Sequence, residues 1–174
     1  MTVAVLRRIA GIAALFFIAG FSAMPCAAAP RTLAGQVIRV ADGDTLTLRN
    51  ARGKKTTVRL AGIDAPEKCQ PFGQRSRASL VELALDRHAT VKVLDIDQYG
   101  RTVGLVRIGD NDETLNRLQI RRGLAWVYAR YNRDTSLRPL EQEARNARRG
   151  LWADKHPVEP WRWRRQYPRG KGCR

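Results

Sequence analysis

Four carboxylates lie within a short stretch of an otherwise strongly basic chain. Asp42 and Asp44 stand in ADGDT, and Asp64 and Glu67 stand in RLAGIDAPE, with Arg59 between the two pairs of acids. Carboxylate oxygens are ligands that hard cations such as Ca²⁺ accept. Phosphodiester cleavage needs an activated water and stabilisation of negative charge in the transition state. The pattern therefore indicates a cation site within a surface that binds a polyanion.

Arginine and glutamate side chains would supply the remaining chemistry. The guanidinium groups of Arg59 and Arg101 suit pairs of phosphate oxygens, and Glu67 is a candidate to position or deprotonate a water. Ordinary interpretations exist beside these, because an Asp in such a motif often only forms a turn and Arg101 could be a solvated hairpin charge. His88 and His156 stand apart from other metal-ligating residue types, so we expect surface residues rather than ligands.

The charge balance indicates an anionic partner. The chain has 174 residues, the length of one domain, with 32 Lys and Arg against 16 Asp and Glu. Such an excess is typical of proteins that bind nucleic acid, an anionic membrane surface or an acidic polymer. Since 44% of the residues are hydrophobic, we expect a folded core rather than general disorder.

Residues 1–29 have the features of an export signal. Arg7 and Arg8 precede the apolar run 9–21, and residues 27–29 offer small side chains for cleavage. A retained anchor is the alternative, although a membrane span needs roughly 20 apolar residues. We expect cleavage and a secreted or periplasmic protein, whose net charge falls from +16 to +14 because two arginines and no acids are removed.

Cys69 and Cys173 remain after cleavage. In an oxidising compartment an even pair often forms a disulfide, which here would tie the C-terminal tail to the segment after Glu67. Two free thiols or a bond between two chains are the alternatives, since two cysteines alone fix no geometry.

Hydrophobic periodicity predicts the strands that must position these residues. Alternation of apolar and polar residues indicates strands between residues 33 and 60, with a turn at 50–53. Two more strands are predicted at 90–95 and 102–108, joined by a turn at 98–100. Residues 64–72 hold two prolines and should form a loop.

Apolar residues at helical spacing predict three helices, at residues 74–85, 114–122 and 136–149. Ala78, Val81 and Leu85 mark the expected buried face of the first helix, and Gly123 and Gly150 are placed to end the other two. This is an α+β order, and five evenly spaced strands fit a small barrel of the OB type, whose open face commonly binds nucleic acid. The tail, rich in Pro, Trp and Arg, is expected to pack loosely.

The hairpin formed by the second and third strands should bring the acidic motifs together. Antiparallel pairing around its turn would place Asp44 opposite Leu60 and Thr45 opposite Arg59. Asp64 follows a few residues past the open end of the hairpin. The two motifs should therefore meet at one mouth of the barrel.

These motifs resemble the staphylococcal nuclease family. The matching pieces are VIRVADGDTLTL, VRLAGIDAPE, QPFGQRSR, DQYGRTVG, LNRLQIRRGLAWVY and EARNARRGLW, in the family's order over roughly residues 35–152. The combination of DGDT, RLAGIDAPE and YGR is highly specific. The resemblance implies an OB-fold barrel with three flanking helices over residues 30–154, with the basic tail 155–174 outside the pattern. It also implies Ca²⁺-dependent hydrolysis of DNA and RNA by attack of an activated water, leaving 3′-phosphate ends.

The resemblance also assigns roles to individual residues. The implied metal ligands are the side chains of Asp44 and Asp64 and the backbone carbonyl of Ala65. The implied catalytic residues are Arg59, Glu67 and Arg101. Residues expected behind the ligands or against the substrate are Asp42, Thr45, Tyr99 and, on a looser match, Tyr128.

The leading interpretation is an exported, monomeric, calcium-dependent nuclease without a stable protein partner and, once the signal is cleaved, without a membrane. One alternative is a noncatalytic OB-type module that binds single-stranded nucleic acid through arginines and aromatic stacking. Binding alone does not need carboxylates beside a polyanion, which favours the nuclease. Another alternative is a cationic protein that binds membranes or cell-wall polymers, which leaves the carboxylates unexplained.

Overall fold

The computed structural model describes residues 31–130, 132 and 134–168. The expected signal segment 1–29 and Cys173 lie outside these residues. Cys69 is disulfide-bonded. Because Cys173 is not among the described residues, the pairing of these two cysteines stays a prediction. In the part of the chain that the structure describes, no helix is long and apolar enough to cross a membrane.

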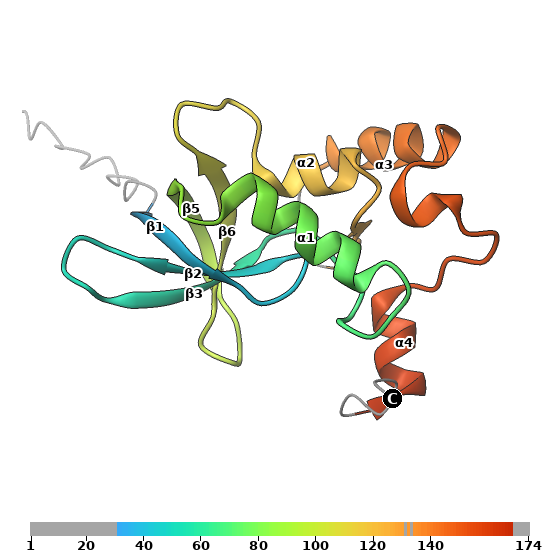
Figure 1. Ribbon diagram of the computed structural model, residues 1–174, viewed down its shortest axis with the longest axis horizontal. Helices are drawn as coiled ribbons and strands as arrows, with labels where there is room; N and C mark the ends of the chain where they lie inside the picture. Colours follow the sequence, from blue (N-terminus) through green and yellow to red (C-terminus); the bar gives the residue numbers. More distant parts are fainter. Residues whose placement is uncertain (1–30, 131, 133, 169–174) are drawn as a thin grey trace, which may run out of the picture.

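Five strands close into a barrel in the order β1-β2-β3-β6-β5 (Figure 1). They are β1 (Thr32–Val40), β2 (Thr45–Arg49), β3 (Lys55–Leu60), β5 (His88–Ile96) and β6 (Thr102–Ile108). Neighbouring strands are antiparallel except β3 and β6, which are parallel. Because side chains alternate along a strand, Val37, Leu46, Val58, Val91 and Val106 all point inward and are fully buried. The predicted α+β fold with a five-stranded barrel is confirmed.

The register of the β2–β3 hairpin is the one predicted from its turn. Thr45 pairs with Arg59, and the backbone amide of Leu60 donates to the carbonyl of Asp44 at 2.8 Å. The loop predicted after this hairpin begins with a short strand, β4 (Ile63–Asp64), which pairs with β7 (Trp126–Val127) in a separate two-stranded sheet.

The three predicted helices are α1 (Gly73–Ala84), α2 (Leu115–Arg121) and α3 (Leu137–Asn146). Gly123, with a φ of 65°, lies just after α2 as expected. The third helix is shorter than predicted because Arg148 and Gly150 both have positive φ, at 50° and 56°, which turns the chain out of the helix. The chain continues there as the short helix η1 (Gly150–Ala153).

The predicted buried face of α1 is wrong at Ala78, whereas Val81 packs against the core. Ala78 is exposed, whereas Ser76 and Ser79 are buried. The hydroxyl of Ser76 donates to the carbonyl of Leu124 at 2.6 Å, and that of Ser79 donates to Oε1 of Gln119 at 2.8 Å. Two serines can therefore be buried here because one finds an acceptor in α2 and the other in the segment just after it.

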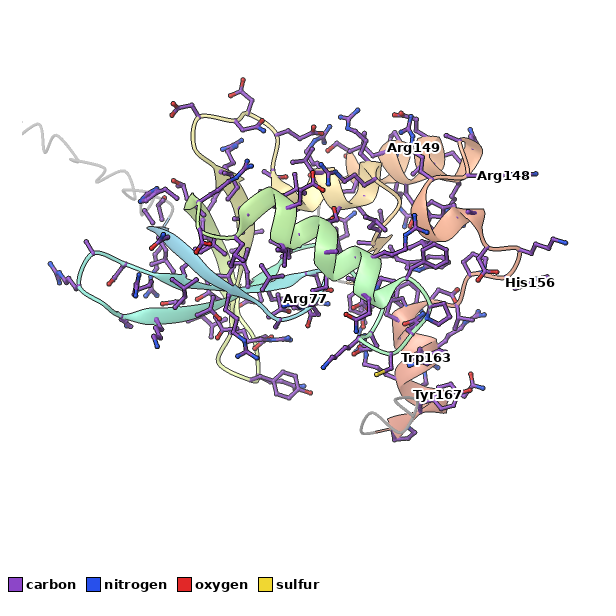
Figure 2. The ribbon with its side chains drawn as sticks, in the orientation of Figure 1. Arg77, Arg148, Arg149, His156, Trp163 and Tyr167 are labelled. Carbon is purple, nitrogen blue, oxygen red and sulfur yellow. The ribbon has the colours of Figure 1, made fainter. Side chains whose placement is uncertain are left out.

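The tail is not loosely packed where the structure describes it. Residues 155–168 include a fourth helix, α4 (Pro160–Gln166), on which Trp161 stacks against the ring of Tyr128 at a centroid distance of 5.2 Å. Trp163 and Tyr167 also contact each other, at 4.5 Å between centroids (Figure 2). The aromatic residues give this short segment an apolar surface to bury. The basic composition of the segment had led to the expectation of loose packing.

Candidate active site

The two acidic motifs meet at Arg59, on the outer side of β3. Nη1 of Arg59 forms an ion pair with Oδ1 of Asp44, and Nη2 forms one with Oδ1 of Asp64 at 2.8 Å. Asp44 is only 5% exposed and Asp64 only 1%. Two buried carboxylates, one from the turn between β1 and β2 and one from β4, thus share one guanidinium group.

The Asp44 carboxylate is held in one orientation by its neighbours. Its Oδ2 accepts the backbone amide of Ala65 at 2.7 Å, and its Oδ1 accepts the hydroxyl of Thr45 at 3.0 Å. Its own amide donates to Oδ1 of Asp42 at 3.0 Å. Asp42 and Thr45 therefore support Asp44, and the backbone of Ala65 lies beside it.

Gly43 lets this turn lie against the helices. A Cβ atom at residue 43 would come within 1.8 Å of Oγ of Ser76 and within 2.8 Å of Cβ of Ala65. Nε2 of the buried Gln119 donates both to the carbonyl of Gly43, at 2.7 Å, and to the carbonyl of Ser76, at 3.1 Å. Helices α1 and α2 therefore fix the turn that carries Asp42 and Asp44.

The crowding of acids perturbs their ionisation. Burial raises the pKa of Asp42 to about 7, and the charge of Asp44 adds to the effect. Burial also raises the pKa of Asp64, against a hydrogen bond from Arg164 and the charge of Arg59. Burial acts in the same direction on Asp44, but the charge of Arg59 and hydrogen bonds outweigh it and lower the pKa of Asp44. A cation beside these groups would favour their charged forms.

Glu67 lies on the loop between β4 and α1. Its amide donates to Oε1 of Gln70 at 3.1 Å, and its carbonyl accepts the amide of Gln70 at 2.9 Å. A Cβ atom at Gly73 would come within 1.9 Å of that carbonyl, so only glycine allows the loop to close this tightly. The Glu67 side chain itself is 41% exposed, so water can reach it.

Arg101 lies on the same side of the barrel but has its own partner. Arg59 pairs with Val103 in the β3–β6 ladder, so Arg101, two residues earlier, faces the same way as Arg59. Nε of Arg101 forms an ion pair with Oδ2 of Asp97 at 2.7 Å, and its guanidinium lies 5.4 Å from the ring centre of Tyr99. Arg101 and Tyr99 therefore form one loop feature, with Tyr99 74% exposed at its tip.

Arg164 and two glutamines belong to the site, and neither the motifs nor the spacing indicated them. Arg164 of α4 contacts both Asp64 and Glu67, Gln70 supports Glu67, and Gln119 supports the Asp42–Asp44 turn. A polar residue on the apolar face of α2 was a signal that could have identified Gln119. Arg164 gave no signal, because it is one of several arginines in the tail.

The donor set fits a hard cation of the Ca²⁺ class. Among the described residues no group of three or more His, Cys, Asp and Glu side chains could hold a metal ion. The expected set needs only two, since Asp44 and Asp64 would be joined by the carbonyl of Ala65 and by water. Positively charged guanidinium groups already lie against both carboxylates, which shows that the position accepts positive charge.

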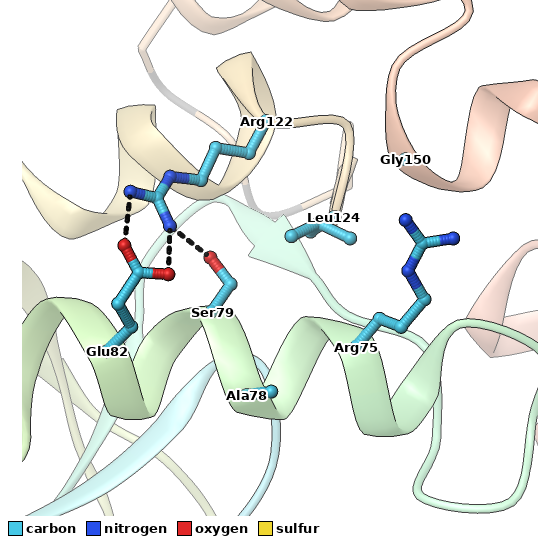
Figure 3. A pocket seen from close by; sticks show the side chains of 7 residues that line it. All are labelled: Arg75, Ala78, Ser79, Glu82, Arg122, Leu124 and Gly150. Atoms are coloured by element: carbon cyan, nitrogen blue, oxygen red, sulfur yellow. Dashed lines mark hydrogen bonds and ion pairs between the residues drawn. The ribbon is translucent and has the colours of Figure 1, made fainter.

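A separate open pocket lies between α1 and the segment after α2 (Figure 3). Arg122 reaches across it to form an ion pair with Glu82 at 3.2 Å and a hydrogen bond with Ser79 at 3.0 Å. No predicted site residue lines this pocket. His88 and His156 are both exposed, as predicted.

Comparisons with known proteins agree with these features. The family model described as "Staphylococcal nuclease homologue" matches residues 57–154. The chain is 42% identical to "Protein ParB" of Escherichia coli over 143 residues, covering 77% of this chain and 80% of that protein. It is 44% identical to an "Uncharacterized endonuclease" of Escherichia coli O157:H7 over 130 residues, covering 75% and 84%. It is 40% identical to a "Micrococcal nuclease" of Shigella flexneri over 140 residues, covering 75% and 80%.

Proposed function

The chain belongs to the staphylococcal nuclease family, and on that premise we propose that it is a calcium-dependent nuclease that cleaves both DNA and RNA. As a member of this family it is an endonuclease that hydrolyses phosphodiester bonds. The further parts of the proposal are the Ca²⁺ requirement, 3′-phosphate products and action outside the cytoplasm after signal cleavage.

The observation that carries the proposal is the pair of buried carboxylates bridged by Arg59. Asp44 and Asp64 are held by backbone and side-chain hydrogen bonds. Burying two charged carboxylates costs free energy, and a surface that only binds nucleic acid does not need them. Buried acids on a chain with a net charge of +16 indicate a position that a cation occupies. The partly exposed Glu67 beside them would supply the base for hydrolysis.

The residues of the site divide the chemistry between them. Asp44 and Asp64, with the carbonyl of Ala65, would hold Ca²⁺, which supplies positive charge beside the scissile phosphate. Once its two carboxylates have another partner, Arg59 is free to donate to phosphate oxygens.

Two further residues would act on water and on the phosphate. Glu67 would take the proton from the attacking water, because its side chain is accessible and its loop is fixed by Gln70. Arg101, directed to the same side as Arg59, would stabilise the charge that develops on the phosphate.

Cleavage assays on the purified mature protein test this function. We expect it to degrade both plasmid DNA and RNA with millimolar Ca²⁺, to stop when EDTA is added, and to leave 3′-phosphate ends that block polymerase extension until a phosphatase removes them. The Asp44→Asn variant should be inactive while remaining folded by circular dichroism. Undiminished cleavage in excess EDTA, or none with Ca²⁺, would contradict the proposal.

A further inference from the structure

The C-terminal helix α4 reaches the site from beyond the family match, which ends at residue 154. Figure 1 shows it below the loop that joins β4 to α1. We propose that α4 is a built-in inhibitor that closes the cation site through Arg164 and covers Tyr128 through Trp161, and that a divalent cation displaces it. The inference rests on the proposed nuclease function and extends it to the regulation of the same site.

Arg164 engages the carboxylates that the reaction needs. Its Nη2 lies 2.7 Å from Oδ2 of Asp64, and its Nη1 lies 3.2 Å from Oδ1 of the same residue. Nη1 also lies 2.7 Å from Oε1 of Glu67. One guanidinium group therefore binds a proposed metal ligand and the proposed general base together.

This contact excludes a metal ion from the same oxygens. Oδ1 of Asp64 is shared by Arg59 and Arg164, and Oδ2 is taken by Arg164. A cation bound to Asp64 would lie within a few ångströms of the Arg164 guanidinium, and like charges at that distance repel strongly in a partly buried site. Binding of the cation and closure by Arg164 are therefore alternatives.

Trp161 covers a second part of the site. Its ring stacks on Tyr128 at 5.2 Å with an interplanar angle of 9°, and it meets Trp126 edge-on at 6.0 Å. Tyr128 is the residue expected to contact a nucleotide, and aromatic faces are where bases stack. One short helix thus blocks both the cation position and an aromatic face.

The closed position is held by one backbone hydrogen bond, by the packing of Pro160 and Trp161, and by the ion pairs of Arg164, and α4 would leave it as a unit. Nε2 of Gln70 donates to the carbonyl of Val158 at 2.6 Å, and Pro160 is buried at the start of α4. The helix has seven residues, too few to persist without packing. The Arg164 side chain is 42% exposed, so its ion pairs are weakened by solvent.

The two arginines on Asp64 differ in what they can do. Arg59 is part of a central barrel strand and stays in the site whether or not a cation is bound. Arg164 stands on the short helix α4, outside the barrel, and can swing out with it, while a Cys69–Cys173 bond would keep the tail tethered to the domain. If α4 is closed about nine-tenths of the time, the apparent Kd for the cation is about tenfold higher than that of the open site.

Calorimetric titration of the metal-free mature protein with Ca²⁺ tests this inhibition. We expect Arg164→Ala to bind Ca²⁺ about tenfold more tightly than the wild type and to keep its kcat at saturating Ca²⁺. Arg165→Ala is the matched control, because it removes the same charge from the same helix at a residue whose hydrogen bond in the described part of the chain stays within α4, at 3.4 Å to the carbonyl of Trp161. This control should match the wild type.

Tryptophan fluorescence gives a readout that does not depend on cleavage. Saturating Ca²⁺ should change the emission of the wild type as Trp161 leaves Tyr128, and the change should be smaller in Trp161→Phe, which keeps Trp163 on the same helix. Equal Ca²⁺ affinity of the wild type and Arg164→Ala, with an active wild type, would overturn the inhibition alone. A lower kcat of Arg164→Ala at saturating Ca²⁺ would also overturn it, since Arg164 would then serve the reaction. A wild type and variants that all fail to bind Ca²⁺ would overturn the proposed function and the inhibition together.

Discussion

Arg59 neutralises two buried acids in the metal-free protein, and it is also the proposed donor to the phosphate. These two roles are compatible because the proposed cation would replace the guanidinium as the partner of Asp44 and Asp64 and would leave Arg59 in place with its donors free. The high charge density that makes the site costly to fold thus also makes it ready for a cation and an anion together.

The proposed base and the second arginine can be tested by truncation. We expect Glu67→Ala and Arg101→Ala each to lower kcat by about two orders of magnitude or more, because each loses one acid–base or electrostatic group. Glu82→Ala and Arg107→Ala remove the same charges at exposed positions outside the site and should stay near wild-type rates. Steady-state cleavage of a labelled oligonucleotide measures this, and unchanged rates in the first two variants would show that the roles are misassigned.

Motif and residue type were sufficient to find the acids and Arg59, because their positions follow from a local turn and a strand register. Arg164 could not be found this way, since its contact with Asp64 joins residues 100 positions apart. Nothing in the sequence distinguishes it from Arg162 or Arg165 on the same helix.

Helices α1 and α2 serve the site by fixing the turn between β1 and β2. Gln119 donates to the carbonyl of Gly43 and also to Ser76, and Ser76 lies so close to residue 43 that only glycine fits there. The positions of Asp42 and Asp44 therefore depend on the packing of the helices against the turn as much as on the turn itself.

Replacement of Gly43 tests this dependence on packing. We expect Gly43→Ala to lower the free energy of unfolding by about 1–3 kcal/mol, because its Cβ must displace the serine of α1, and also to weaken Ca²⁺ binding. The control, Gly53→Ala, meets no atom within 4 Å and has a φ of 77°, so it should cost only about 1–2 kcal/mol of backbone strain and leave Ca²⁺ binding unchanged. Urea unfolding and calorimetry measure the two effects, and normal Ca²⁺ affinity in Gly43→Ala would contradict this account.

Periodicity predicted the barrel and three helices, but it failed where polar residues are buried or an element is short. The buried face of α1 contains Ser76 and Ser79, which an apolar pattern cannot identify. Helix α4 has seven residues without an apolar stripe, and its position depends on Trp161 finding Tyr128 and Trp126. Both features depend on partners distant in sequence.

The whole molecule presents a strongly basic surface around a small acidic site. Most of its arginines and lysines are exposed and would hold a polyanion through its backbone rather than through base identity. Affinity for substrate and the chemical step should therefore respond differently to salt.

Ionic strength should act on substrate binding rather than on turnover. We expect KM for long DNA to rise at least about tenfold between about 50 and about 200 mM NaCl, the change that two phosphate contacts alone produce in B-DNA, with kcat nearly constant. A dinucleotide substrate, which spans only the site, is the control and should show a weaker dependence. The same salt dependence for both substrates would mean that the surrounding surface does not hold the DNA.

The contacts that assemble the site join distant segments, which determines when activity begins during biosynthesis. Asp64 pairs with Trp126, and Gln119 holds Gly43. A nascent chain that has not reached residue 127 lacks these contacts, and so does a chain kept unfolded for translocation. We therefore expect no hydrolysis until the chain up to residue 127 has been made and folded.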